Sequence, residues 1–337
     1  MSNIGLDIGT KTIKVVELER SGNSFLLKAS GVIGYKGGDI EKLVEEKDLA
    51  AASDIVAKLF KDAGVGGRDV FLALPESLVF TRSIKLPFLT DQEVAAAIRW
   101  EAEQYIPIPV KEAIIQHQVL SRVESGAEPG VLVLLVAAPR VLVEKYIGLV
   151  QAARLNVVAV ETELMSMVRC LAPANQTVLV IDFGARSVDI AIAKNSLLVF
   201  SRSIPTAGEA LSRALTQTLQ ITPAEAEEYK RVYGLSGSQL EGKIRAALEP
   251  VVGGIVDEIK KAIHFYQTEE KGESPASAII SGGVAGMPEL ISFMTNKLSI
   301  EILVANPFSR IQVDKDVWTR LAPYAPLYSI AVGLAMR

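Results

Sequence analysis

The sequence predicts an α/β protein with two halves that share a local motif. Two strand–turn–strand passages support this, IGLDIGTKTIKVVEL at residues 4–18 and VLVIDFGARSVDIAIA at residues 178–193. Their aspartates, Asp7 and Asp182, are 175 residues apart, which is about half of the 337-residue chain. Elsewhere, short apolar runs alternate with segments of helical periodicity, a pattern typical of α/β domains.

The composition describes a globular chain and excludes several classes of protein. Hydrophobic residues make up 49% and charged residues 22%, which predicts a large core. The net charge of −4 leaves no cationic excess for nucleic acid, and a single cysteine with two histidines argues against disulfides and zinc. The longest apolar run, 131–139, is too short to cross a bilayer, and no signal-peptide pattern is present. We therefore expect a cytoplasmic protein without direct membrane insertion.

The first third of the chain predicts an α/β domain. Its expected elements are strands at 4–9, 12–20 and 25–35, a helix with apolar positions from Leu49 to Phe60, and a buried strand at 69–75. The pattern changes after Pro75, where TDQE at 90–93 forms a capping box that opens a helix. Strand-like runs and a helix at 140–154 follow, so residues 76–155 are expected to form an inserted subdomain.

The second half begins with the repeated passage and continues with helices. TPAE at 222–225 places a threonine at the N-cap and a proline at the first helical position. A long helical stretch spans 239–267, and the strand at 277–283 then returns to α/β alternation.

The two repeated turns predict a phosphate-binding cleft. Glycine lets the backbone approach a ligand, and consecutive N–H groups in such a turn bind anions. A carboxylate at each strand end, Asp7 and Asp182, can hold a hydrated Mg²⁺. A third turn at 278–290 opens a helix after Gly282 and Gly283. The alternative interpretation is a pair of ordinary β-hairpins and a plain strand-to-helix turn.

The order DIGT, DFGA and SGG, followed by AVGLA at 331–335, resembles the actin, heat-shock-protein-70 and sugar-kinase superfamily. Segments 83–113 and 160–171 resemble, more specifically, the family of type IV pilus assembly proteins PilM, which are relatives of the cell-division protein FtsA. The resemblance implies an actin-like two-domain fold, with duplicated ribonuclease-H-like halves and an inserted FtsA-like 1C subdomain. The implied division is subdomain 1A at 1–75 plus 156–176, 1C at 76–155, 2A at 177–206 plus 276–326, 2B at 207–275, and a C-terminal interdomain helix at 327–337.

The resemblance also implies that ATP or ADP binds with Mg²⁺ between the two halves. The residues expected at the nucleotide are Asp7, Gly9, Thr10, Lys11, Thr12, Asp182, Gly184, Ala185, Arg186, Gly208, Glu227, Lys230, Gly282, Gly283 and Val284, with Asp7 and Asp182 also at the metal. Glu227 and Lys230 match positions that meet the ribose and base in relatives. The alternative for this pair is a solvated ion pair within one helix.

Two departures from the superfamily pattern predict slow or absent ATP hydrolysis. Ala185 and Arg186 stand where close relatives carry glycines, and Arg186 either contacts phosphate or faces solvent. Thr162 occupies the position where hydrolysing relatives place Glu or Gln. Glu161 and Glu163 flank it, and a shift of one residue turns a helical side chain by about 100°, so the sequence does not decide which acid faces the water.

The resemblance implies a cytoplasmic ATP-binding scaffold at the cytoplasmic face of the inner membrane. Such a scaffold docks the N-terminal cytoplasmic tail of the inner-membrane protein PilN, in a groove involving the insert and the first domain. It thereby links the membrane platform to the pilus motor ATPases. The alternatives are an active ATPase or sugar-kinase-like phosphotransferase, for which a clear catalytic base is missing, and an FtsA-like filament former, which would usually add a C-terminal membrane helix.

Overall fold

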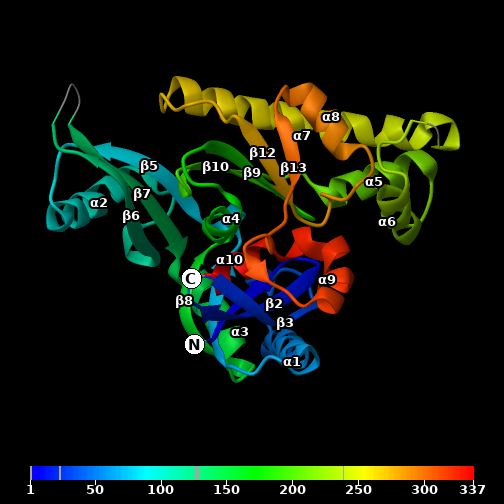
Figure 1. The fold of residues 1–337 in the computed structure, drawn as a ribbon, viewed down its shortest axis with the longest axis horizontal. Coiled ribbons are helices and arrows are strands. Elements are labelled where there is room, and N and C mark those ends of the chain that lie inside the picture. The colour runs from blue at the N-terminus through cyan, green and yellow to red at the C-terminus, as the bar shows by residue number, and fades with distance from the viewer. Residues whose placement is uncertain (1, 23, 126–128, 238) are drawn as a thin grey trace.

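The computed structural model describes residues 2–22, 24–125, 129–237 and 239–337. Its first half is built on a six-stranded sheet with the order β14-β3-β2-β1-β4-β8 (Figure 1). The strands are β1 (Ser2–Ile8), β2 (Thr12–Ser21), β3 (Ser24–Gly34), β4 (Asp69–Leu74), β8 (Asn156–Thr162) and β14 (Ile311–Gln312). Nearly every residue in the middle of β1 and β2 is buried, because helices cover both faces of the sheet.

Four helices provide this cover. They are α1 (Glu46–Ala63), α3 (Arg140–Ala152), α4 (Glu163–Leu171) and α10 (Ser329–Ala335). Val15 of β2 packs in the cluster that contains α1 and α3, whereas its neighbour Val16 packs in the cluster that contains α10. The alternation of side chains along a strand therefore places the two helix pairs on opposite faces.

The second half repeats this local arrangement on a five-stranded sheet with the order β11-β10-β9-β12-β13. The strands are β9 (Thr177–Phe183), β10 (Val188–Lys194), β11 (Leu197–Ile204), β12 (Ser277–Ser281) and β13 (Glu301–Val304). In each half an antiparallel three-stranded meander is joined by a parallel strand beside its first strand, β4 beside β1 and β12 beside β9. The expectation of two halves with one motif is confirmed.

Helices of the second half pack against this sheet and against one another. They are α5 (Gly208–Leu219), α6 (Pro223–Val232), α7 (Lys243–Thr268) and α8 (Leu290–Leu298). The helix α6 begins with the predicted capping box at Thr222. The long helix α7 continues through Pro250, and Figure 1 shows it lying along the top of the molecule.

The inserted piece has its own sheet, with the order β5-β7-β6, and one helix. Its elements are β5 (Phe80–Leu86), α2 (Asp91–Tyr105), β6 (Ala113–Val123) and β7 (Gly130–Pro139). The predicted insert extended to residue 155, but α3 packs in the first-half core through Leu142, Tyr146 and Val150. The inserted piece therefore ends at Pro139, because the apolar side of α3 is buried by the first sheet.

The segment after β13 also differs from the prediction, which assigned residues 276–326 to the second half. Phe308, Ile311 and Leu321 pack against Val16 and Leu18 of the first sheet. β14 pairs with β3, and α9 (Lys315–Leu321) follows it, so the chain crosses back after β13. Short 3₁₀ helices complete the fold: η1 (Ile40–Lys42), η2 (Glu76–Leu78), η3 (Val110–Glu112), η4 (Gln239–Gly242) and η5 (Ala322–Tyr328).

The helix α10 is held tightly against its neighbours by two glycines. A Cβ at Gly5 of β1 would lie 2.0 Å from the carbonyl oxygen of Ala331, and a Cβ at Gly333 would lie 1.9 Å from that of Ser166. The hydroxyl of Ser281, at the end of β12, donates to the Ser329 hydroxyl at the start of α10. The helix thus contacts both halves. In the described part of the chain, no helix is long and apolar enough to span a bilayer.

Candidate functional site

The two repeated turns have the same backbone hydrogen bond. Gly9 N–H donates to the Thr12 carbonyl and Gly184 N–H donates to the Ser187 carbonyl, each at 3.1 Å. A Cβ at either glycine would lie 3.0–3.1 Å from that carbonyl oxygen, which is too close for ordinary contact. Thr10 in the first turn is partly exposed. Both turns therefore favour glycine, whose missing side chain leaves the backbone accessible.

The strands behind the turns place charged side chains at equivalent positions. Asp7 lies opposite Lys14 in the β1–β2 pair, and Asp182 lies opposite Asp189 in the β9–β10 pair. The Lys14 ammonium donates to the buried Asp7 carboxylate at 2.9 Å. The sequence analysis did not select Lys14 or Asp189. The signal was available, because each stands seven residues after the aspartate of its repeat.

Further carboxyl groups lie near the Asp7–Lys14 and Asp182–Asp189 pairs. Glu163, at the start of α4, accepts a 3.0 Å hydrogen bond from Glu76 N–H. The protein packed around Glu163, and then the charges of Asp7, Asp189 and Asp182, raise its pKa well above its usual range. Burial and the charge of Asp189 raise the pKa of Asp182 to about 7, although Lys14 opposes the shift. The mutual repulsion of these closely spaced carboxyl groups therefore disfavours the ionisation of all of them together.

The acids around Thr162 now have distinct positions. Thr162 itself is the N-cap of α4, accepting from Met165 N–H. Glu161 forms a two-pronged ion pair with Arg169, with N–O distances of 2.6 and 2.7 Å. Glu163, in contrast, interacts electrostatically with Asp7, Asp189 and Asp182.

The third turn lies against the second one. Val284 N–H donates to the Phe183 carbonyl, and a Cβ on Gly282 would lie 2.5 Å from an Asp182 carboxylate oxygen. Gly282 has φ +93°, a conformation that favours glycine. A Cβ on Gly208 would meet Val284 and the Gly184 carbonyl. The structure thus brings Gly184, Gly208, Gly282 and Val284 together, with Gly283 exposed beside them.

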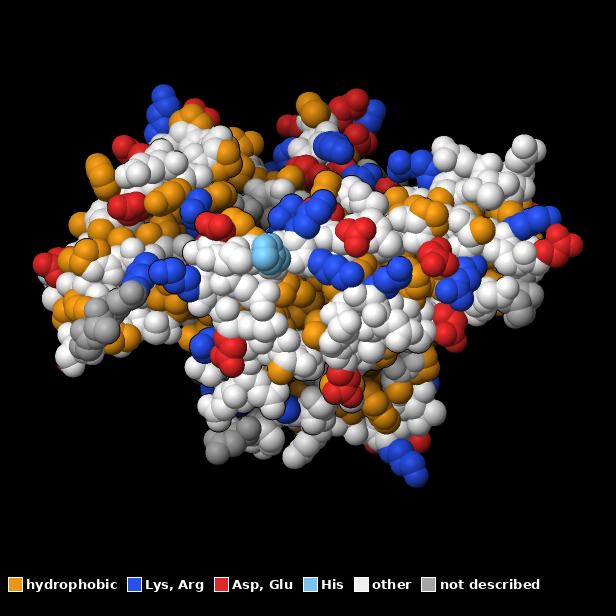
Figure 2. Space-filling model, turned by 90° about the horizontal axis from the view of Figure 1, so that it is seen from above, with side chains coloured by type: hydrophobic (Ala, Val, Ile, Leu, Met, Phe, Trp, Pro, Cys, Tyr) orange, Lys and Arg blue, Asp and Glu red, His pale blue; other side chains and the backbone are white. Residues whose placement is uncertain are grey.

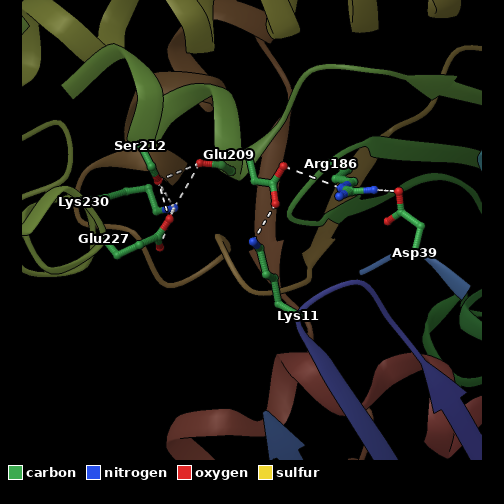
Figure 3. A network of polar contacts seen from close by, with 8 residues as sticks. Lys11, Asp39, Arg186, Glu209, Ser212, Glu227 and Lys230 are labelled. Carbon is green, nitrogen blue, oxygen red and sulfur yellow. Dashed lines mark hydrogen bonds and ion pairs between the residues drawn. The ribbon is translucent and has the colours of Figure 1, made fainter. Parts of the chain in front are cut away.

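Glu227 and Lys230 are part of a network rather than a solvated pair (Figure 3). Lys230 is buried, and its ammonium donates to the Gly208 carbonyl, to the Ser212 hydroxyl and to Glu227, at 2.8–3.0 Å. Ser212 also donates to Glu227. This network ties α6 to the first turn of α5. It places the exposed part of Glu227 beside the Gly208 turn.

Arg186 is engaged by carboxylates of both halves. Its guanidinium forms an ion pair with Asp39, which precedes η1, and lies 3.6 Å from Glu209 in the first turn of α5. Glu209 also forms a 2.7 Å ion pair with Lys11, which lies in the glycine turn between β1 and β2 (Figure 3). Ala185 contributes its backbone carbonyl, which accepts from Glu209 N–H at 2.7 Å. Nothing local in the sequence pointed to Asp39 or Glu209, which are distant from the turns along the chain.

The residues present suit a hydrated Mg²⁺ that is coordinated mainly by water and phosphate oxygens rather than by protein side chains. Within the described residues, no group of three or more His, Cys, Asp or Glu side chains is arranged to hold a metal ion by itself. The buried Oδ1 of Asp189 has no hydrogen-bond partner there. Together with the raised pKa of Asp182, this is an acceptor-rich floor that a cation would complement. Asp7 and Asp182 would hold the ion through its waters.

Comparison with known proteins identifies the family. The family model for type IV pilus assembly protein PilM matches residues 5–337. The chain belongs to the PilM family. A solved structure titled "PilM-PilN type IV pilus biogenesis complex" contains a chain 26% identical to this one, with a TM-score of 0.85, covering 99% of this chain and 98% of that one.

More distant matches share the fold. Cell division protein FtsA of Staphylococcus epidermidis is 25% identical over 257 residues, which cover 68% of this chain. That match spans about half of the FtsA length, 54%. MreB 5 of Spiroplasma citri bound to AMPPNP is 15% identical with a TM-score of 0.54, covering 98% of this chain and 94% of that one. These likenesses confirm the predicted actin-like two-domain fold.

Proposed function

We propose that the protein is an ATP-binding scaffold of type IV pilus assembly that docks the N-terminal cytoplasmic tail of an inner-membrane PilN. One observation carries the nucleotide part: two glycine turns with the same backbone hydrogen bond carry Lys11 and Arg186, and each of these cations reaches an acid of the opposite half, in a chain of the PilM family. PilN docking is supported by the similar PilM-PilN complex. Through this partner the protein would sit at the cytoplasmic face of the inner membrane and connect it to the pilus motor ATPases.

We expect the polyphosphate of ATP or ADP to lie between the turns, with a hydrated Mg²⁺ near Asp7 and Asp182. Hydrolysis should be slow or absent. Arg186 occupies the second turn with a side chain that is engaged by Asp39. Ala185 beside it also carries a side chain where close relatives have glycine, so the backbone approaches phosphate less closely. These features support a protein that holds ATP rather than one that turns it over.

Nucleotide binding is tested by equilibrium titration with ATP and ADP, beside a phosphate-release assay. Asp182→Asn should weaken binding in the presence of Mg²⁺ by at least tenfold. The control is Asp257→Asn, on the exposed side of α7, which should bind like the parent chain. Absence of binding to either nucleotide at millimolar concentration would refute the site, and turnover of several per second would refute the scaffold assignment.

The insert offers an apolar surface for a partner. Phe88, Trp100 and Val123 are large hydrophobic residues of this region that are 42%, 65% and 47% exposed. In Figure 2, hydrophobic side chains gather over the end of the molecule formed by the insert, whereas charges of both signs intermingle along the middle. We place the extended PilN tail in a groove between the insert and the first half, with aromatic side chains as anchors.

A synthetic N-terminal tail of the cognate PilN tests this placement in a calorimetric titration. Trp100→Ala should weaken binding by about tenfold or more, as loss of an aromatic anchor does. Tyr324→Ala is the control, because Tyr324 is 57% exposed and lies outside the insert. Photocrosslinking from the bound tail would then map its path. Crosslinks confined to the cavity between β5 and β11, lined by Phe80, Phe200 and Phe265, would instead place the site between the insert and the second half.

A further inference from the structure

Four charged residues form a chain of alternating charge across the cleft, Lys11–Glu209–Arg186–Asp39 (Figure 3). Lys11 and Asp39 belong to the first half, whereas Arg186 and Glu209 belong to the second. The two contacts that cross between the halves are Lys11–Glu209, at 2.7 Å, and Asp39–Arg186. Each half supplies one cation and one anion, so both ion pairs join the two halves.

The two carboxylates are well suited to hold these cations. The Asp39 side chain is only 5% exposed, and it also pairs with Lys42 at 2.8 Å instead of capping η1. Partial burial alone would raise the pKa of Glu209, but the hydrogen bond from Lys11 and the charges of Lys11, Arg186 and Arg213 lower it. Glu209 therefore stays ionised at neutral pH and remains a competitor for any anion in the cleft.

We propose that these ion pairs form a latch that closes the cleft without nucleotide, and that a nucleotide polyphosphate replaces Glu209 as the partner of Lys11 and Arg186. The exchange rests on the proposed nucleotide binding. Both cations project from the glycine turns, and their side chains are 60% and 41% exposed, so they can reorient toward a ligand. A polyphosphate offers the same negative charge with more acceptor oxygens than one carboxylate. The latch thus makes Glu209 an internal inhibitor of nucleotide binding.

The affinity test compares Glu209→Gln with the parent chain in titrations with ATP and Mg²⁺. Loss of a partly exposed ion pair is expected to tighten ATP binding roughly two- to fivefold. Asp39→Asn should act in the same direction by freeing Arg186, and it does not alter the charge at the start of α5. Glu249→Gln is the matched control, because it breaks the 2.9 Å Arg245–Glu249 ion pair within α7 and should leave ATP affinity unchanged.

A second readout needs no nucleotide. Spin labels at Lys58→Cys on α1 and Lys260→Cys on α7 report the separation of the halves, while the natural Cys170 is buried and escapes labelling. Without nucleotide, Glu209→Gln and Asp39→Asn should lengthen or broaden the distance distribution relative to the parent and to Glu249→Gln. Unchanged distances and unchanged or weaker ATP binding in both variants would overturn the latch. A parent chain that binds no ATP would instead refute the nucleotide site, and the spin-label distances would still test the latch.

Discussion

The Glu76→Gln variant should gain stability relative to the parent chain as the pH rises from 5 to 8. Glu76 lies at the start of η2 and is 4% exposed. Its Oε2 has no hydrogen-bond partner among the described residues, whereas its backbone N–H bond to Glu163 would survive the change. Burial, and then the charge of Asp189, raise the pKa of Glu76 from 4.5 to about 7.

The sign of the effect follows from proton linkage. Below pH 4.5 the carboxyl is protonated in both states, and its contribution to stability is fully present. As the pH rises from 4.5 to about 7, the unfolded chain loses this proton before the folded one, so the stability of the parent falls. A difference of 2.5 pKa units corresponds to about 3 kcal/mol, an upper bound where water can relax the charge.

The assay is urea unfolding of both proteins at pH 5, 6, 7 and 8. The stability of Glu76→Gln minus that of the parent should increase by about 2–3 kcal/mol across this range. Glu112→Gln removes an exposed carboxylate and serves as the control. A stability difference that does not change with pH, or one that decreases toward pH 8, would refute the assignment of a raised pKa to the buried Glu76.

Three further predictions concern the same region. Gly282→Ala should cost about 1–3 kcal/mol of stability in thermal unfolding, because its Cβ would strike Asp182 at a φ of +93°, whereas Gly286→Ala, with open space around it, should be tolerated. Arg169→Ala should destabilise the protein by about 2–3 kcal/mol in urea, since it leaves Glu161, whose side chain is 6% exposed, with only the 3.8 Å contact to Arg337 and removes the bond to the Gly333 carbonyl. Lys230→Met should weaken ATP binding by about tenfold or more in titration, with exposed Lys260→Met as control.

Local geometry was predictable from the sequence because it depends on neighbours in the chain. The capping boxes at Thr90 and Thr222 form as expected, since their hydrogen bonds join residues three positions apart. The two repeated turns were also predictable from the sequence, because each has a glycine where a carbonyl oxygen lies close to the backbone. The actin-like fold followed from the resemblance carried by the order of these turns, and the FtsA-like insert followed from the resemblance of segments 83–113 and 160–171.

Packing partners were less predictable. The periodicity of α3 showed that one side is buried, yet an amphipathic pattern does not say which sheet buries it. For residues 276–326 the resemblance implied one subdomain, and it gave no indication that Phe308, Ile311 and Leu321 pack on the first sheet. The polar partners of the cleft show this limit again: Glu209 reaches Lys11 only through the fold, and no sequence spacing joins them.

The duplicated turns are chemically unequal, and the inequality suggests how they divide one ligand between them. In the first half Asp7 faces Lys14, so its charge is already balanced by a buried ammonium. In the second half Asp182 faces Asp189, so two carboxyl groups share one side of the cleft. Of the two aspartates proposed at the hydrated Mg²⁺, Asp182 should therefore attract the ion more strongly than Asp7, and phosphate oxygens should be drawn toward Lys14. The two halves would then hold opposite charges of a single Mg²⁺–nucleotide complex, which explains why one motif is kept twice with different side chains behind it.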